Sequence, residues 1–116
     1  MEFKDLVGMT LSAVKESNDE IIFTAEDGRK FRMFHYQDCC ESVYIESIVG
    51  DLGDLVGTPI LVAEEATSDK NPLAEYEMSF TWTFYKLATV KGWVDIRWYG
   101  SSNGYYSESV SFEEMK

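Results

Sequence analysis

Apolar and polar residues alternate most clearly in the last third of the chain. One alternating run covers residues 76–84, and a shorter one covers residues 94–98. A period of two residues is typical of β-strands that bury one face. The apolar phase shifts after Phe84, which predicts a bulge or a strand crossing at that point. With a glycine-rich turn at 100–104 and a closing strand over 106–112, the pattern predicts a three-stranded antiparallel meander.

Shorter strands separated by turn residues fill the first two thirds of the chain. Asp27-Gly28 is a strong hairpin signal, because this dipeptide tolerates the positive φ angles of a tight turn. Residues 66–72 are polar and predict a loop. The predicted strands cover residues 11–15, 20–25, 30–36, 43–49 and 60–64.

Two segments have the apolar spacing of a short helix that a glycine ends. They lie near residues 2–8 and 51–57. The sequence over residues 5–11 also resembles that over residues 54–60. Both stretches begin with Asp-Leu-Val-Gly, and both lead into a predicted strand. This echo indicates either two half-units of similar design or a chance similarity between short stretches of common residues.

The pattern as a whole predicts a single α+β domain over residues 1–116. The fold is expected to be mostly antiparallel β, as one twisted sheet of six to eight short strands with two short helices. A chain of 116 residues with 45% apolar residues is long enough for one hydrophobic core. It is too short for two ordinary domains.

Negative charge is concentrated in the middle of the chain. Residues 1–36 hold seven acids and five bases, residues 37–79 hold ten acids and Lys70 alone, and residues 80–116 hold four of each. The middle block therefore carries −9 of the net charge of −11. Such a block repels nucleic acid and is attracted to basic surfaces. Solubility is the other interpretation of the same charge.

Several protein classes are disfavoured by the composition. The two cysteines are adjacent, which excludes a disulfide scaffold and favours a reducing cytoplasm. No apolar run approaches the ~20 residues that a membrane span needs. The first five residues, Met-Glu-Phe-Lys-Asp, do not have the pattern of a signal peptide.

The densest group of reactive side chains lies between His35 and Glu41. His35, Asp38, Cys39 and Cys40 are imidazole, carboxylate and thiolate donors, the ligand types that zinc accepts. The sequence therefore predicts a zinc site in this loop. Two buried structural thiols beside a hydrogen-bonded histidine are the alternative. A cysteine nucleophile is disfavoured, because the acidic surroundings would raise the pKa of the thiol.

Other enzyme signatures are missing, and we expect no catalytic activity. The glycines mark turns and form no phosphate-binding loop. The aromatic residues of the last third are expected in the core, because no basic groove accompanies them for stacking on nucleobases. Tyr99, Tyr105 and Tyr106 flank the 100–104 loop and suggest a protein-contact edge.

The stretch from Phe34 to Glu41, continued by residues 48–52, resembles an uncharacterised family of small acidic phage proteins, with similarity over residues 3–65. Some acidic phage proteins of this size are anti-CRISPR inhibitors. The resemblance implies an inhibitor that binds a type II RNA-guided DNA nuclease in the host cytoplasm and blocks nucleic-acid loading. A small zinc-binding or thiol-dependent phage accessory protein, or a structural interaction protein, is the alternative.

Such an inhibitor would bind the basic surface of the host nuclease, with no membrane and no direct nucleic-acid binding. The contacts would come from the carboxylates of the acidic block. The predicted partner-binding residues are Glu41, Glu46, Asp51, Asp54, Glu64, Glu65 and Asp69.

Overall fold

The computed structural model describes residues 2–17, 19–37, 40–70, 79–102 and 108–115. Within these ranges the chain forms eight β-strands and two single 3-10 turns. The turns are η1 (Phe3–Leu6) and η2 (Leu52–Leu55). The strands are β1 (Leu11–Glu16), β2 (Glu20–Ala25), β3 (Lys30–Phe34), β4 (Ser42–Val49), β5 (Val62–Lys70), β6 (Ser79–Thr89), β7 (Gly92–Ser102) and β8 (Ser111–Met115).

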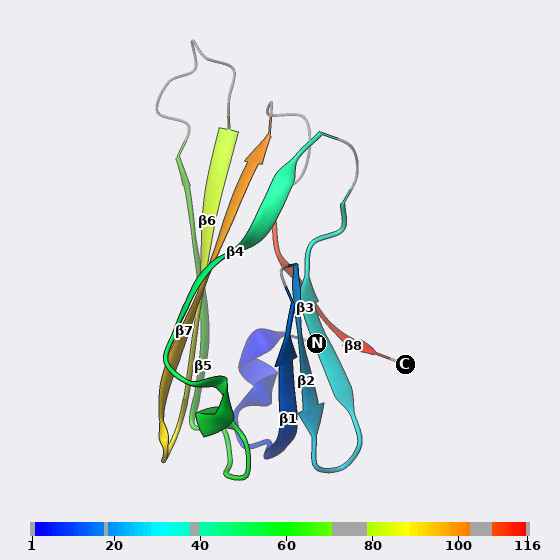
Figure 1. Cartoon of the computed structure of the whole chain (residues 1–116), viewed down its shortest axis with the longest axis vertical. Coiled ribbons are helices and arrows are strands. Elements are labelled where there is room, and N and C mark those ends of the chain that lie inside the picture. Colours follow the sequence, from blue (N-terminus) through cyan, green and yellow to red (C-terminus); the bar gives the residue numbers. More distant parts are fainter. Residues whose placement is uncertain (1, 18, 38–39, 71–78, 103–107, 116) are drawn as a thin grey trace.

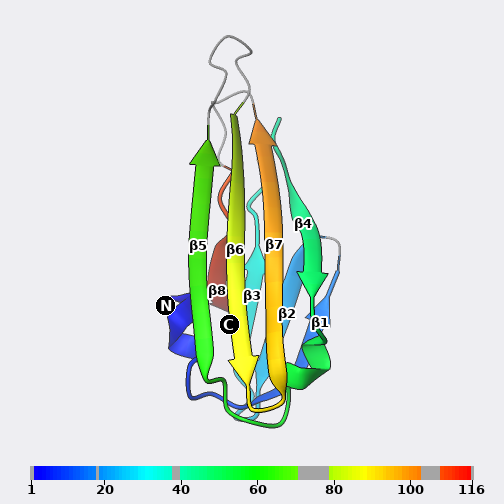
Figure 2. The same cartoon turned by 90° about the vertical axis from the view of Figure 1, so that its left-hand side faces the viewer.

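The strands form two four-stranded sheets that pack face to face (Figure 1). One sheet has the order β1-β2-β3-β8 and the other the order β4-β7-β6-β5, and every pairing is antiparallel. Figure 2 shows the second sheet in front of the first. In each sheet three consecutive strands form a meander, and the fourth strand comes from the other half of the chain. The halves have therefore exchanged β4 and β8.

The mostly antiparallel β fold expected from the sequence is confirmed, but its finer details differ. The strands form two sheets rather than one, and the two expected helices are single 3-10 turns of four residues each. An apolar spacing of three residues fits one 3-10 turn as well as a helix. Val7 and Val56 then return the backbone to extended ψ angles, so neither turn continues.

The expected C-terminal meander is wrong in its last strand. β8 pairs with β3, and β7 pairs instead with β4 and β6. β5 extends to Lys70, through part of the loop expected over residues 66–72. β6 runs without a bulge, and its register with β5 and β7 is continuous across Phe84. The phase shift in the sequence arises because the aromatic residues before Tyr85 do not face the core.

The core lies between the two inner sheet faces. The Nε1–H of Trp98 on β7 donates a hydrogen bond to the Met33 sulfur on β3 at 3.2 Å, which joins the sheets. Phe3 of η1 packs between them, with its ring 4.7 Å from that of Tyr85 and 5.3 Å from that of Phe112. No helix among the described residues has the length and apolar character needed to cross a membrane.

The two segments that echo each other in the sequence lie against each other at one end of the sandwich. The Gly8 N–H donates to the Ile60 carbonyl at 2.8 Å, and the Gly57 N–H donates to the Leu11 carbonyl at 2.9 Å. These four residues occupy matching places in the two copies. Both glycines have φ angles near +90°, which other residues adopt only with strain. The echo thus has a geometric counterpart, a reciprocal clasp between the halves.

Leu55 tests how the two copies contribute to the core. Leu55 is fully buried, so Leu55→Ala removes core contacts and is expected to cost about 2–5 kcal/mol of unfolding free energy. Val7, in the first copy, is 50% exposed, so Val7→Ala should cost less than about 1 kcal/mol. Urea denaturation of the two variants measures both values. Equal losses would contradict the assignment of Leu55 to the core and Val7 to the surface.

Candidate functional site

The predicted metal cluster lies where the chain crosses from β3 to β4. There His35 and Glu41 form a buried pair, with side chains only 4% and 0% exposed. The Nδ1 of His35 lies 2.7 Å from the Ser109 carbonyl, and its Nε2 lies 3.1 Å from the Glu41 carboxylate. A carbonyl can only accept, so Nδ1 donates. The Nε2–carboxylate contact likewise needs one proton, on the imidazole or on the acid.

A second buried glutamate supports the other crossover, between β7 and β8. The Glu108 carboxylate accepts hydrogen bonds from Thr81 Oγ1 at 2.8 Å and from Ser102 Oγ at 2.5 Å. Gly100 lets this segment approach β7, since a Cβ there would lie 2.9 Å from the Glu108 carbonyl oxygen. Both crossovers are thus fixed by a buried carboxylate with hydrogen-bonded partners.

This arrangement restricts the predicted zinc site. Asp38 and Cys39 lie outside the described residues, both ring nitrogens of His35 are hydrogen-bonded, and Cys40 is disulfide-bonded. In the described part of the chain, no three histidine, cysteine or acidic residues come together as a metal site. Zinc would require His35 to release a hydrogen bond and Cys40 to be reduced to a thiolate. The site therefore stays a prediction.

The predicted partner-binding carboxylates separate into four places. Glu41 is buried against His35, so the expectation that it contacts a partner is corrected. Asp51 and Asp54 lie at η2, where Asp51 caps the turn by accepting from the Gly53 N–H. Glu46 lies on β4, and the remaining residues, Glu64, Glu65 and Asp69, lie on β5. Of Asp69 the structure describes the backbone position alone.

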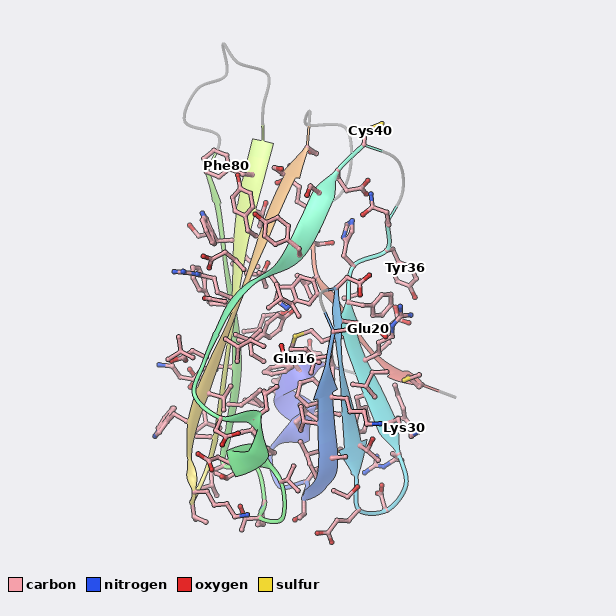
Figure 3. The ribbon with its side chains drawn as sticks, in the orientation of Figure 1. Glu16, Glu20, Lys30, Tyr36, Cys40 and Phe80 are labelled. Atoms are coloured by element: carbon pink, nitrogen blue, oxygen red, sulfur yellow. The ribbon has the colours of Figure 1, made fainter. Side chains whose placement is uncertain are left out.

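Among the described residues, five aromatic rings pack together on the outer face of the β4-β7-β6-β5 sheet. They are hereafter the aromatic face: Tyr44 on β4, Tyr99 on β7, and Phe80, Trp82 and Phe84 on β6. Trp82 is central, with its ring 4.7 Å from Tyr99 and 6.5 Å from Phe84, nearly parallel to the latter. Tyr99 in turn contacts Tyr44 and Phe80, at 5.9 and 6.3 Å. Phe80 lies toward the upper end of β6, on the opposite side of the molecule from Tyr36 (Figure 3).

Arg97 connects the aromatic face to the acidic edge strand β4. Its Nε donates to a Glu46 carboxylate oxygen at 2.5 Å, and its guanidinium lies 5.2 Å from the centre of the Trp82 ring. The hydrogen bond from Arg97 lowers the pKa of Glu46, which keeps that carboxylate ionised near neutral pH. Arg97 is thereby held in place by an ion pair and a cation–π contact.

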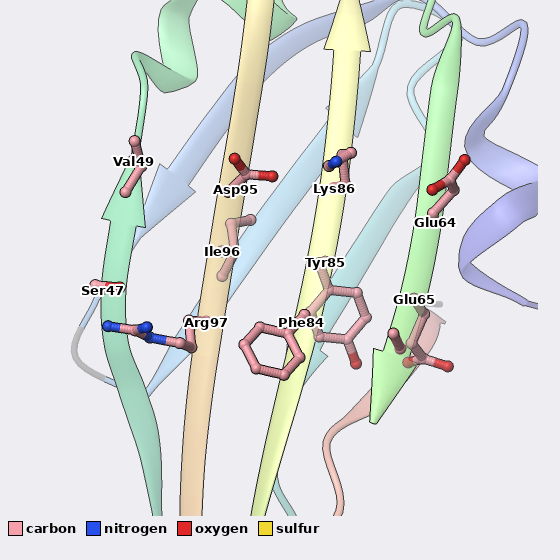
Figure 4. A pocket seen from close by; sticks show the side chains of 11 residues that line it. Ser47, Val49, Glu64, Glu65, Phe84, Tyr85, Lys86, Asp95, Ile96 and Arg97 are labelled. Carbon is pink, nitrogen blue, oxygen red and sulfur yellow. The ribbon is translucent and has the colours of Figure 1, made fainter. Parts of the chain in front are cut away.

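A shallow groove of about 450 Å³ crosses this sheet beside the aromatic face. Phe84 and Arg97 lie along it, between Val49 on β4 and the Glu64–Glu65 pair on β5 (Figure 4). Cross-strand pairing sets one row of the groove as Val49, Asp95, Lys86 and Glu64. Tyr85 faces inward from the same strand, and burial raises the pKa of its phenol, which keeps it neutral.

The outer face of the other sheet is built differently. There Arg32 pairs with Glu20 at 2.5 Å and lies 3.9 Å from the centre of the Phe34 ring. Phe34 is itself only 3% exposed, and the hydroxyl of Tyr36 donates to Glu113. On the aromatic face, by contrast, Phe84 is 40% and Tyr44 is 42% exposed. The two halves share a strand order but not an outer surface.

The aromatic face was not expected from the sequence, because hydrophobicity alone placed Phe80, Trp82 and Phe84 in the core. The residues that face inward are Thr83, Tyr85 and Leu87. Residues two apart on a strand share a face, so counting back in twos from Leu87 places Tyr85 and the threonines inside and the aromatic rings outside. Of the tyrosines suggested as a contact edge, Tyr99 belongs to this face, whereas Tyr105 and Tyr106 lie outside the described residues.

The fold and this surface define the molecule as a two-sheet antiparallel β-sandwich with an exposed aromatic sheet face. Residues 4–112 match the family model described as a domain of unknown function (DUF7448). The match covers nearly the whole chain, so the protein belongs to this family. No curated protein matches it, and no solved structure does.

Glu41 tests the buried pair at the first crossover. Glu41→Ala removes the carboxylate partner of His35 Nε2 and the Oε1 acceptor of the Gln37 amide at 3.0 Å, although that amide keeps its bond to the residue 41 carbonyl at 2.9 Å. We expect it to cost about 3 kcal/mol of unfolding free energy. Glu41→Gln is the matched control. Its amide can donate to a neutral His35 and accept from Gln37, so about 1 kcal/mol should be lost. Chemical denaturation measures both, and similar losses would contradict the hydrogen-bonding scheme.

Proposed function

We propose that this protein is a non-enzymatic binding protein that captures a basic partner protein on the aromatic face. The observation that carries the proposal is the ladder of five rings around Trp82, two of them exposed and three half-buried, with carboxylates on both edge strands of the same sheet. Exposed apolar patches rimmed by polar residues are typical of interaction sites.

The composition of the face suits protein recognition. Tryptophan, tyrosine and arginine are the residues enriched at interface hot spots, and Trp82, Tyr99 and Arg97 form one packed unit here. Four strands about 4.8 Å apart and about 35 Å long give a sheet face of about 500 Å². A standard interface buries about 800 Å² per partner, so the face would supply its centre and the edge strands its rim.

Charge supports a basic partner over an acidic one. Three carboxylates, those of Glu46, Glu64 and Asp95, lie on the outer face against the two cations Lys86 and Arg97. Glu65 pairs across the strands with the inward-facing Tyr85 and so lies on the other face of β5. With a net charge of −11, the whole chain adds long-range attraction to a basic surface.

The partner implied by the sequence resemblance is a type II RNA-guided DNA nuclease of the host cell. Such nucleases hold nucleic acid in a positively charged channel through backbone contacts. A rigid anionic sandwich seated there would compete for the same lysine and arginine side chains and block nucleic-acid loading. A structural interaction protein would use the same face on another partner, which a binding test with the nuclease distinguishes.

Trp82 tests whether the aromatic face carries the binding. Trp82→Ala should weaken association with the purified nuclease by about 30-fold and relieve inhibition of cleavage in parallel, since it removes the central ring. Ile22→Ala, on the outer face of the other sheet, is the matched control and should leave both unchanged. Calorimetry and a cleavage assay measure the effects. No complex with the wild-type protein would contradict this partner, and equal affinities of both variants would contradict this face.

Charge reversal tests the electrostatic part separately. Glu64→Lys with Glu65→Lys, on β5, should slow association several-fold and flatten its dependence on salt, because steering is screened beyond about 8 Å at physiological ionic strength. Glu16→Lys with Glu26→Lys makes the same charge change on exposed residues of the other sheet's meander and should slow association less. Stopped-flow kinetics at several salt concentrations measure the association rates of the two double variants. Equal rates would contradict a local role of the β5 carboxylates.

A further inference from the structure

We infer that the groove beside Phe84 takes a cationic side chain, an arginine or lysine of the partner, between the Phe84 ring and the carboxylates that line the groove. This inference rests on the proposed function and names the chemistry of its central contact. It follows from three features of the described residues: which rings already hold a cation, which carboxylates already have a counter-charge, and the shape of the groove.

The first feature is the distribution of cations over the rings of this sheet. Trp82 has the Arg97 guanidinium 5.2 Å from its ring centre, and Trp93 has the Lys86 ammonium at 5.5 Å. Cation–π contacts form within about 6 Å, so both rings are in use. In the part of the chain that the structure describes, no cation lies over Phe84, although its ring is 40% exposed and borders the groove.

The second feature is the balance of charge along the groove. Arg97 is engaged by Glu46, and Lys86 lies against the Trp93 ring. None of the ion pairs formed between described residues uses Glu64 or Asp95, and both flank Lys86 in the cross-strand row. Two carboxylates therefore share one lysine, which itself lies against Trp93, and the row keeps an excess of negative charge for a ligand.

The third feature is the shape. The groove spans all four strands and holds about 450 Å³, within the range of sites that receive a side chain or a small ligand. Its two ends differ, with Val49 and Ser47 at the β4 side and the Glu64–Glu65 pair at the β5 side (Figure 4). A long side chain entering beside Phe84 on β6 would lay its apolar stem along that ring and direct its charge toward Glu64 on the neighbouring strand β5.

A neutral occupant fits less well. A sugar or an apolar side chain would cover the Phe84 ring but partly desolvate carboxylates without giving them a counter-charge, which is unfavourable. A guanidinium or ammonium satisfies ring and carboxylates together, and each contact strengthens as water is displaced. The groove therefore selects for positive charge as well as for apolar length.

Short peptides test this directly on the intact protein. The probe is an acetylated Gly-Arg-Gly amide, and its control replaces arginine by citrulline, which keeps the shape and removes the charge. In NMR titrations we expect the arginine peptide to shift the amides of Phe84, Glu64 and Arg97 and to bind about three- to tenfold more tightly than the citrulline peptide. Equal binding of the two peptides, or the same shifts with a neutral disaccharide, would overturn the inference.

Phe84→Leu removes the aromatic ring but keeps an apolar side chain, so it distinguishes the cation–π contact from simple apolar contact. It should remove most of the preference for arginine over citrulline while leaving the weaker binding of citrulline unchanged. Tyr44→Leu, on the aromatic face but outside the groove, should leave the preference intact. If Trp82→Ala abolishes nuclease binding but Phe84→Leu leaves the arginine preference untouched, the inference fails and the proposed function stands. If the arginine peptide binds as described and no nuclease complex forms, the inference stands and the nuclease is contradicted as the partner.

Discussion

Each sheet of this protein is completed by a strand from the other half of the chain, and the rest of the structure adapts to that exchange. β4 has to leave the first half to pair with β7, and β8 has to leave the second half to pair with β3. Two segments must therefore cross between the sheets at one end of the sandwich. A crossing segment has no neighbouring strand to satisfy its polar groups, so side chains have to do so.

The two buried glutamates meet this requirement. At the first crossover, the Glu41 carboxylate is hydrogen-bonded to His35 and Gln37. At the second, the Glu108 carboxylate accepts hydrogen bonds from Ser102 and Thr81. His35 also reaches the Ser109 carbonyl, so the two crossovers are joined to each other. At the opposite end, the clasp around Gly8 and Gly57 ties the beginnings of the two halves. The sandwich is thus fastened at both ends, which leaves the outer faces available to diverge in chemistry.

The sequence predicted what depends on local periodicity and missed what depends on pairing between distant segments. Most strands and the Asp27-Gly28 hairpin were found, because alternation and turn chemistry are local. The pairing of β8 with β3 has no local signal, since nothing near Phe112 distinguishes β7 from β3 as a neighbour. Phe80, Trp82 and Phe84 were assigned to the core because burial was inferred from side-chain type, and a binding surface reverses that rule. The His35 cluster attracted a metal interpretation because donor types alone do not reveal that Ser109 and Glu41 already occupy both ring nitrogens.

The exchange of strands also governs how this chain has to be made. β1, β2 and β3 precede β8 by most of the described chain, yet β8 is the strand that covers the outer edge of β3. Loop-closure entropy opposes such distant pairings, and an uncovered edge is a template for strands of other molecules. Until β8 has folded back onto β3, the first three strands therefore present an unpaired edge, to which a β8 from a neighbouring copy is the complementary strand.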